Sequence, residues 1–153
     1  MASDDQPIKT FANSRDSDVA PGKWCAGFSA CKKYATDHNV PLITVWVTNE
    51  TCSYCKRFAL AAMSETFKTW MKDTGYVFWA GCKYCTGEDG ENGAGQSWCP
   101  SSGTLPRCRV YWAPNGNAKV NKYLDGNTLG NVTWISDETE QVKVQSNRII
   151  NAL

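Results

Sequence analysis

The sequence predicts an α/β domain built on a mixed central sheet of four to five strands flanked by helices. A β-branched and aromatic run, Leu42–Val47, is typical of a strand buried on both faces, and a second, apolar run at 76–80 follows one helical segment later. The order helix, strand, helix, strand predicts parallel strands joined by helical crossovers. With 153 residues, 42% of them hydrophobic, the chain has material for one compact domain.

The first half of the chain divides into a leader and the first predicted elements. Residues 1–23 are polar and contain two prolines, so we expect a polar N-terminal leader with no helix and little capacity to build a core, ahead of a domain at 24–153. Apolar and small residues at helical spacing predict a helix over Phe28–His38. After the central strand, the pattern over 55–72 predicts one long amphipathic helix.

The second half of the chain contains a loop, a hairpin and a closing helix. Residues 86–103 are rich in glycine, serine and acids without periodicity, which predicts a cysteine-rich loop insertion at the surface. Arg107–Trp112 and 119–124 flank a Pro-Asn-Gly turn and predict a β-hairpin. A helix capped by Ser136 or Asp137 is expected to close the domain.

Charge and hydropathy argue against several classes of partner. The formal net charge is +1, which provides no basic field for nucleic acid or an anionic membrane. No apolar run reaches the length of a membrane span, and the acidic opening of the chain differs from a signal peptide. We therefore expect a protein that is cytoplasmic where it is made, with incorporation into a particle such as a virion as an alternative. Eight cysteines without a signal indicate metal binding or redox chemistry.

Three features coincide in one known family. A Cys-x-x-Cys motif at 52–55 lies between the central strand and the following helix, Gly-Thr-Leu-Pro at 103–106 precedes the later strand, and a hairpin follows. In this order and spacing, residues 24–153 resemble the thioredoxin-like superfamily. The resemblance implies a three-layer fold, a cis Pro106 that faces Cys52, and thiol-disulfide exchange at the cysteine pair.

The chain also departs from the family pattern. Thioredoxins usually carry Trp-Cys-Gly-Pro-Cys where this chain has Thr-Cys-Ser-Tyr-Cys at 51–55, and the buried acid expected on the preceding strand is missing. Thr44 is the one polar residue in that strand. Proton transfer during exchange would then need another route, so the sequence leaves open whether the pair turns over a substrate.

The physical chemistry of a helix N-terminus assigns different roles to the two cysteines. Unpaired backbone N–H groups and the helix dipole favour a thiolate there, so we expect Cys52 to attack and Cys55, one turn further in, to resolve. Lys56 and Arg57 follow and add positive potential. Exchange of this kind requires no dissociable cofactor. The alternatives are an inert disulfide or half of a zinc site.

The other six cysteines are expected to cluster at the same end of the sheet. Topology predicts that four of them crowd around this end and that the remaining two lie slightly deeper; the four are Cys25, Cys82, Cys85 and Cys99, and the two are Cys31 and Cys108. Disulfides that brace the loop are preferred for Cys82, Cys85, Cys99 and Cys108; a tetrahedral zinc site formed by these four is the second alternative and free thiols are the third.

Two functions from different classes follow. The first is a thioredoxin-like oxidoreductase that acts on protein disulfides through Cys52 and Cys55. The second is a non-catalytic thioredoxin-fold component of a larger assembly, for example a virus particle, in which cysteines brace loops and neighbouring subunits are the partners. A zinc-stabilised interaction domain is a third.

Overall fold

The computed structural model describes residues 6–47, 53–90, 107–112, 114 and 123–124. Within them a five-stranded sheet has the order β1-β3-β2-β4-β5. Strand β3 pairs in parallel with β1 and β2, whereas β4 runs antiparallel to both β2 and β5. The mixed α/β class is therefore confirmed, as is the central position of β2. The strands are β1 (Trp24–Cys25), β2 (Leu42–Val47), β3 (Val77–Cys82), β4 (Arg107–Trp112) and β5 (Tyr123–Leu124).

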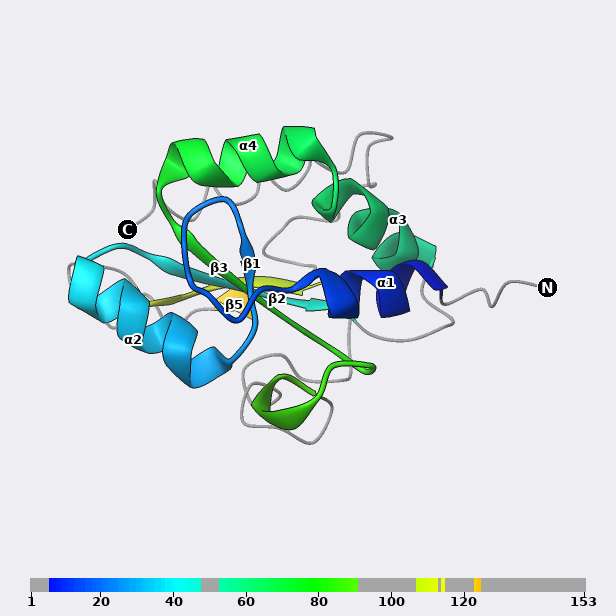
Figure 1. The fold of residues 1–153 in the computed structure, drawn as a ribbon, viewed down its shortest axis with the longest axis horizontal. Helices are drawn as coiled ribbons and strands as arrows, with labels where there is room; N and C mark the ends of the chain where they lie inside the picture. Colours follow the sequence, from blue (N-terminus) through cyan, green and yellow to red (C-terminus); the bar gives the residue numbers. More distant parts are fainter. Residues whose placement is uncertain (1–5, 48–52, 91–106, 113, 115–122, 125–153) are drawn as a thin grey trace.

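Helices cover both faces of the sheet (Figure 1). Alternate residues of β2 point in opposite directions, so Ile43, Val45 and Val47 enter one core with α1, α3 and α4. Leu42 and Trp46 enter a second core with α2. The helices are α1 (Gln6–Ser14), α2 (Phe28–His38), α3 (Ser53–Ala62) and α4 (Glu65–Thr74), and a 3-10 turn, η1, spans Gly87–Asp89.

The N-terminal segment belongs to the core, so the expectation of a leader without a helix is wrong. Pro7 is the second residue of α1, and a proline is tolerated in the first turn, where its missing N–H would have no helical partner. Ile8 and Phe11 are fully buried. The ring of Phe11 lies edge-on to that of Trp24, with the centroids 5.3 Å apart. Helix α1 therefore closes the core over α3 and β3.

The single long helix predicted over 55–72 is two helices. Helix α3 ends at Ala62, and Ser64 caps α4 by accepting a hydrogen bond from the backbone N–H of Phe67 at 3.2 Å. Glu65 occupies the first turn of α4, where its negative charge complements the helix dipole. Gly75 ends α4 with a φ of 72°, a conformation that favours glycine.

The α2 side of the sheet contains two stacked tryptophans. Trp46 and Trp79 lie with ring centroids 6.5 Å apart and are both fully buried. Gly81 makes room for them, because a Cβ atom at this position would lie 2.5 Å from atoms of both rings.

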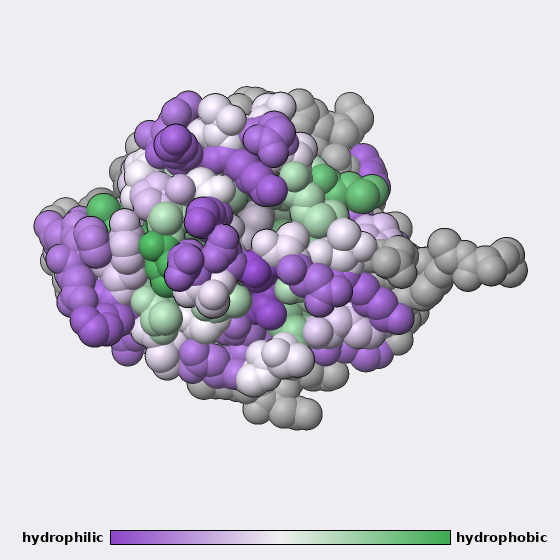
Figure 2. All heavy atoms as spheres, in the orientation of Figure 1, coloured by the Kyte–Doolittle hydropathy of each residue, from purple (hydrophilic) through white to green (hydrophobic). Residues whose placement is uncertain are grey.

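The face of the molecule shown in Figure 2 is mostly polar. Among the described residues, Leu60 of α3 is the one large apolar side chain that is exposed, at 57%.

No helix in the described part of the chain is long and apolar enough to cross a membrane. The predicted surface loop at 86–103 begins with η1: Thr86 and Gly87 are exposed and Glu88 is half-buried, whereas Asp89, the last residue of η1, is 3% exposed and points into the protein. The rest of this loop, most of the predicted hairpin turn and the predicted closing helix lie outside the described residues.

Candidate redox site

Cys55 lies in the first turn of α3, the helix that follows the central strand β2. Its side chain is fully buried and its sulfur is disulfide-bonded. Cys52 lies outside the described residues, and so do Cys99, Pro106 and the side chain of Cys108. The cis bond at Pro106 and its contact with Cys52 therefore stay predictions.

Aromatic packing fixes the helix that carries Cys55. Phe58, one turn further along α3, lies edge-on to Trp24 and Phe67, with ring centroids 6.0 Å apart in each case. The indole Nε1 of Trp24 donates a hydrogen bond to the backbone oxygen of Ala62 at 2.9 Å, which satisfies a carbonyl at the C-terminal end of α3. Strand β1 thus anchors one end of α3, while its other end carries the cysteine.

Positive charge follows Cys55 along α3. Lys56 is half-buried and Arg57 is exposed, so both lie within a turn of the cysteine on the side that water reaches. Cations near a helix N-terminus favour the thiolate form of a cysteine. The arrangement therefore suits an anionic sulfur at the start of α3.

A second Cys-x-x-Cys pair closes the end of the neighbouring strand. Cys82 is the last residue of β3 and forms a disulfide with Cys85. The backbone N–H of Cys85 donates to the oxygen of Cys82 at 3.1 Å, which forms a tight turn. Both sulfur-bearing residues belong to the same core as Cys55. For these two cysteines the structure has the disulfide that we preferred; the zinc alternative also needs Cys99 and Cys108.

Another disulfide lies on the other face of the sheet. Cys25 and Cys31 are bonded and join β1 to the first turns of α2. Because successive residues of a strand alternate, Trp24 faces the core of α3 while Cys25 faces that of α2. The structure therefore places Cys25 and Cys31 on the opposite face of the sheet from Cys55, an arrangement that the sequence analysis did not predict.

Asp89 is a buried carboxylate that the sequence analysis missed. It accepts hydrogen bonds from the backbone N–H groups of Gly27 and Phe28 at the start of α2 and from the indole Nε1 of Trp79. Arg15 pairs with it at 2.8 Å. Four donors from three separate segments converge on this one carboxylate, so Asp89 stabilises the fold and does not replace the acid that β2 lacks.

The start of α2 has a second acidic cap. Glu88 accepts a hydrogen bond from the backbone N–H of Ser29 at 2.8 Å and another from its hydroxyl. With Asp89, this places two carboxylates at the N-terminus of α2, where the helix dipole favours negative charge. A sequence signal existed, since Glu-Asp follows a glycine in an otherwise polar loop, but nothing local indicates which helix these acids cap.

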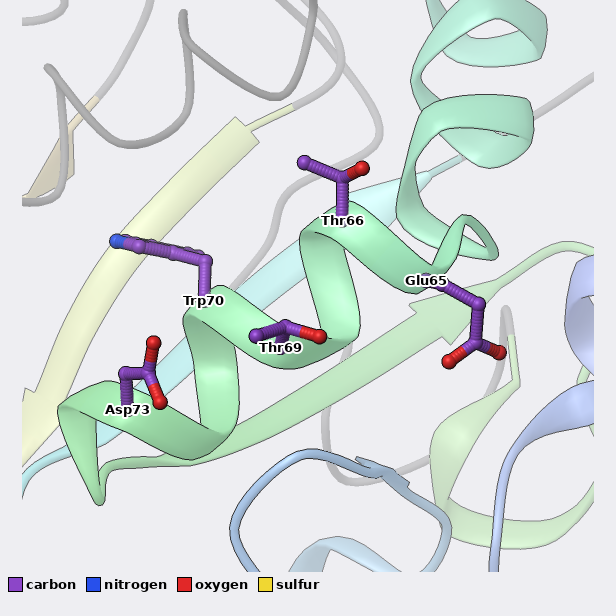
Figure 3. Close-up of a pocket in the computed structure, with 5 residues that line it drawn as sticks. All are labelled: Glu65, Thr66, Thr69, Trp70 and Asp73. Atoms are coloured by element: carbon purple, nitrogen blue, oxygen red, sulfur yellow. The ribbon is translucent and has the colours of Figure 1, made fainter.

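A separate hollow of about 420 Å³ lies beside α4 (Figure 3). Two carboxylates, two hydroxyls and one indole line this hollow. No cysteine of the described part of the chain is among its lining residues. Its lining residues are Glu65, Thr66, Thr69, Trp70 and Asp73.

Two further observations bear on cofactors and relatives. Among the residues that the structure describes, no group of three or more histidines, cysteines and acids is arranged to hold a metal ion. No family model, curated protein or solved structure matches this chain. The case for a function therefore depends on the geometry of the cysteines.

Proposed function

We propose that this chain is a thioredoxin-like thiol-disulfide oxidoreductase that acts on protein disulfides through Cys52 and Cys55. The observation that carries the proposal is the position of Cys55: a disulfide-bonded, fully buried cysteine in the first turn of the helix that follows the central strand. We propose Cys52 as its bonded partner, because only two residues lie between the two cysteines in the sequence.

The order of the strands supports a thioredoxin-like arrangement. Parallel strands β1, β3 and β2 are followed by the antiparallel pair β4 and β5, with β2 in the middle. In an open sheet of this kind, reactive groups gather at the carboxyl ends of the parallel strands. The cysteine motif at 52–55 follows the carboxyl end of β2.

The proposed reaction is a pair of thiolate displacements. The Cys52 thiolate attacks one sulfur of a substrate disulfide, which forms a mixed disulfide and releases the other substrate sulfur as a thiolate. The Cys55 thiolate then attacks Cys52, which re-forms the internal disulfide and releases the second substrate thiol. The burial of Cys55 fits the second role, since a substrate protein reaches an exposed sulfur first. An external thiol reductant restores the dithiol.

A second candidate is a non-catalytic structural component whose partners are neighbouring subunits of an assembly. Two observations favour it. The disulfides Cys25–Cys31 and Cys82–Cys85 are both almost fully buried, as braces are, and β2 carries Thr44 where an acid would assist proton transfer. In this case the pair at 52–55 would be one more brace.

Reduction of insulin disulfides by the full chain, with dithiothreitol as reductant, tests the proposal. We expect the wild-type protein to accelerate precipitation of the insulin B chain, and Cys52→Ser to abolish the acceleration because no attacking sulfur remains. The matched control is Cys31→Ser, which breaks a disulfide on the opposite face and should still accelerate precipitation. A wild-type protein without activity, together with equal losses of stability in Cys52→Ser and Cys55→Ser, would favour the structural candidate.

A further inference from the structure

The start of α2 depends on carboxylates from a distant part of the chain. Gly27, the residue before the helix, has a φ of 91° and no side chain that could cap it. The backbone N–H groups of Gly27 and Phe28 donate to Asp89, and the backbone N–H of Ser29 donates to Glu88. Three consecutive N–H groups without a helical partner are therefore satisfied by two acids of η1.

Each half of this contact is closed by a disulfide. The three N–H groups lie within the loop that the Cys25–Cys31 bond closes. The two acids follow the turn that the Cys82–Cys85 bond closes. We name this set the α2 clamp; it consists of the two disulfides, the N–H groups of residues 27–29 and the carboxylates of Glu88 and Asp89.

The turn at Cys82–Cys85 determines where the acids lie. The backbone N–H of Cys85 donates to the oxygen of Cys82 at 3.1 Å, so the turn leads directly out of β3. Gly90 packs back onto this turn, because a Cβ atom at Gly90 would lie 2.4 Å from the carbonyl oxygen of Cys85. Residues 86–89, which include both acids, thus form a short loop whose two ends meet at Cys85.

The sheet joins the two halves of the α2 clamp. Cys25 of β1 is the Cα partner of Trp79 of β3, and parallel partners point to the same side of a sheet. The indole Nε1 of Trp79 donates to Asp89. One carboxylate therefore contacts both the start of α2 and the strand residue beside Cys25.

The sulfur-bearing residues of the α2 clamp are nearly inaccessible to water. Cys25, Cys31 and Cys82 are at most 1% exposed and Cys85 is 8% exposed. Thiol-disulfide exchange requires a thiolate to reach a disulfide sulfur, so a reductant needs this part of the protein to open first. Opening of the α2 clamp and reduction of its disulfides are therefore linked.

We infer that the α2 clamp is a redox-responsive switch, which is closed while both disulfides are formed and which releases Glu88 and Asp89 from the start of α2 when a thiol reduces them. Each disulfide limits the conformations of one half of the clamp, so the closed clamp favours both bonds. Such a coupling is reciprocal, and loss of either bond should weaken the other by the same factor. Neither Cys52 nor Cys55 takes part, so the switch does not depend on the proposed function.

The reduction balances for each bond when glutathione is the thiol. A first glutathione thiolate attacks one sulfur of the disulfide, which forms a mixed disulfide and releases the other cysteine as a thiolate that takes up a proton. A second glutathione thiolate attacks the glutathione sulfur and releases the remaining cysteine. The products are two cysteine thiols and one glutathione disulfide, so two electrons and two protons have moved to the protein.

Equilibration of the full chain with glutathione buffers tests the coupling. Alkylation after an acid quench, followed by peptide mapping, gives for each disulfide a half-reduction ratio, which is the squared concentration of glutathione divided by that of glutathione disulfide. Glu88→Ala keeps all eight cysteines and removes one acid of the α2 clamp. We expect it to lower the half-reduction ratio of both disulfides by at least about threefold.

The matched control is Asp37→Ala, which removes an exposed acid of α2 outside the clamp. It should leave both half-reduction ratios at their wild-type values. Equal ratios in Glu88→Ala and Asp37→Ala would overturn the switch, because the carboxylates would then have no influence on the disulfides.

A variant that carries Cys82→Ser together with Cys85→Ser tests the release of the acids directly. We expect amide hydrogen exchange at residues 27–29, followed by NMR, to be at least about tenfold faster than in the wild type, while the amides of β2 keep their rates. Unchanged exchange at 27–29, or an equal acceleration in β2, would contradict the switch. If this variant does not fold, Glu88→Ala decides alone, since it leaves every disulfide in place.

Discussion

Arg15 and Asp89 form an ion pair inside the protein, with Nη1 and Oδ2 2.8 Å apart and the two side chains 7% and 4% exposed. Seventy-four positions separate them in the chain. Arg15 also donates to the backbone oxygen of Ala80 in β3 at 3.2 Å, so one guanidinium joins the end of the N-terminal segment to the sheet and to the turn after it.

Asp89→Asn should destabilise the fold strongly. The substitution removes the charge that pairs with Arg15 and places an amide N–H₂ among donors that need an acceptor. Breaking a buried pair by changing one partner costs about 3–5 kcal/mol. Urea denaturation followed by far-UV circular dichroism measures the loss.

The control for this variant is an exposed pair. Lys33 and Asp37 lie one turn apart on α2 with side chains 77% and 54% exposed, and Asp37→Asn should change the free energy of unfolding by less than about 1 kcal/mol. Equal effects of the two substitutions would show that burial of the Arg15–Asp89 pair is unimportant.

Phe11→Ala should cost about 3–5 kcal/mol of stability, as expected for a fully buried aromatic ring. The ring contacts Trp24 and Phe58, so its loss leaves a cavity between α1 and α3. The exposed neighbour Asn13 provides the control, and Asn13→Ala should be nearly neutral. If Phe11→Ala unfolds at the wild-type urea midpoint, the N-terminal helix is dispensable and its place in the core is wrong.

The stability of the fold should depend on the ionisation of Asp16 at acidic pH. The backbone N–H of Asp18 donates to its carboxylate at 2.9 Å and Lys23 lies 3.3 Å away, and these contacts lower the pKa of Asp16 below its ordinary value of 3.8. A lowered pKa means that the ionised form stabilises the folded state. This stabilisation is complete above pH 3.8 and is lost as the pH falls through the pKa of the folded protein.

The corresponding measurement compares Asp16→Asn with the wild type over a range of pH. We expect the variant to be slightly less stable at pH 6 and equal to the wild type at pH 2, with a small difference because the site is exposed. A difference in unfolding midpoint that is the same at both pH values would exclude a contribution from ionisation.

Local patterns in the sequence were enough to predict the sheet and the place of Cys55. Leu42–Val47 is apolar except for Thr44 because both of its faces are covered, and this pattern identifies a central strand. Phe28–His38 has the predicted bounds. The break between α3 and α4 also had a local signal, Ser64 followed by Glu65, which is typical of a helix start and outweighs the continuing apolar pattern.

The errors concern contacts between distant parts of the chain. Pro7 was interpreted as a residue that prevents a helix, but it lies in the first turn of α1, where a proline is tolerated. The burial of Asp89 depends on Arg15 and on the start of α2, and no local pattern connects these segments. Cys25 was also assigned to no face of the sheet from the sequence, and the alternation of Trp24 and Cys25 across β1 places the two on opposite faces once this two-residue strand is recognised.

Trapping of a mixed disulfide tests the central claim most directly. The Cys55→Ser variant keeps the attacking sulfur but lacks the resolving one, so incubation with a peptide that contains one disulfide should yield a covalent adduct at Cys52 by mass spectrometry. Cys52→Ser, which leaves the buried sulfur alone, should form none. An absence of adduct in both variants, or equal amounts in both, would contradict the assignment of attack to Cys52 and resolution to Cys55.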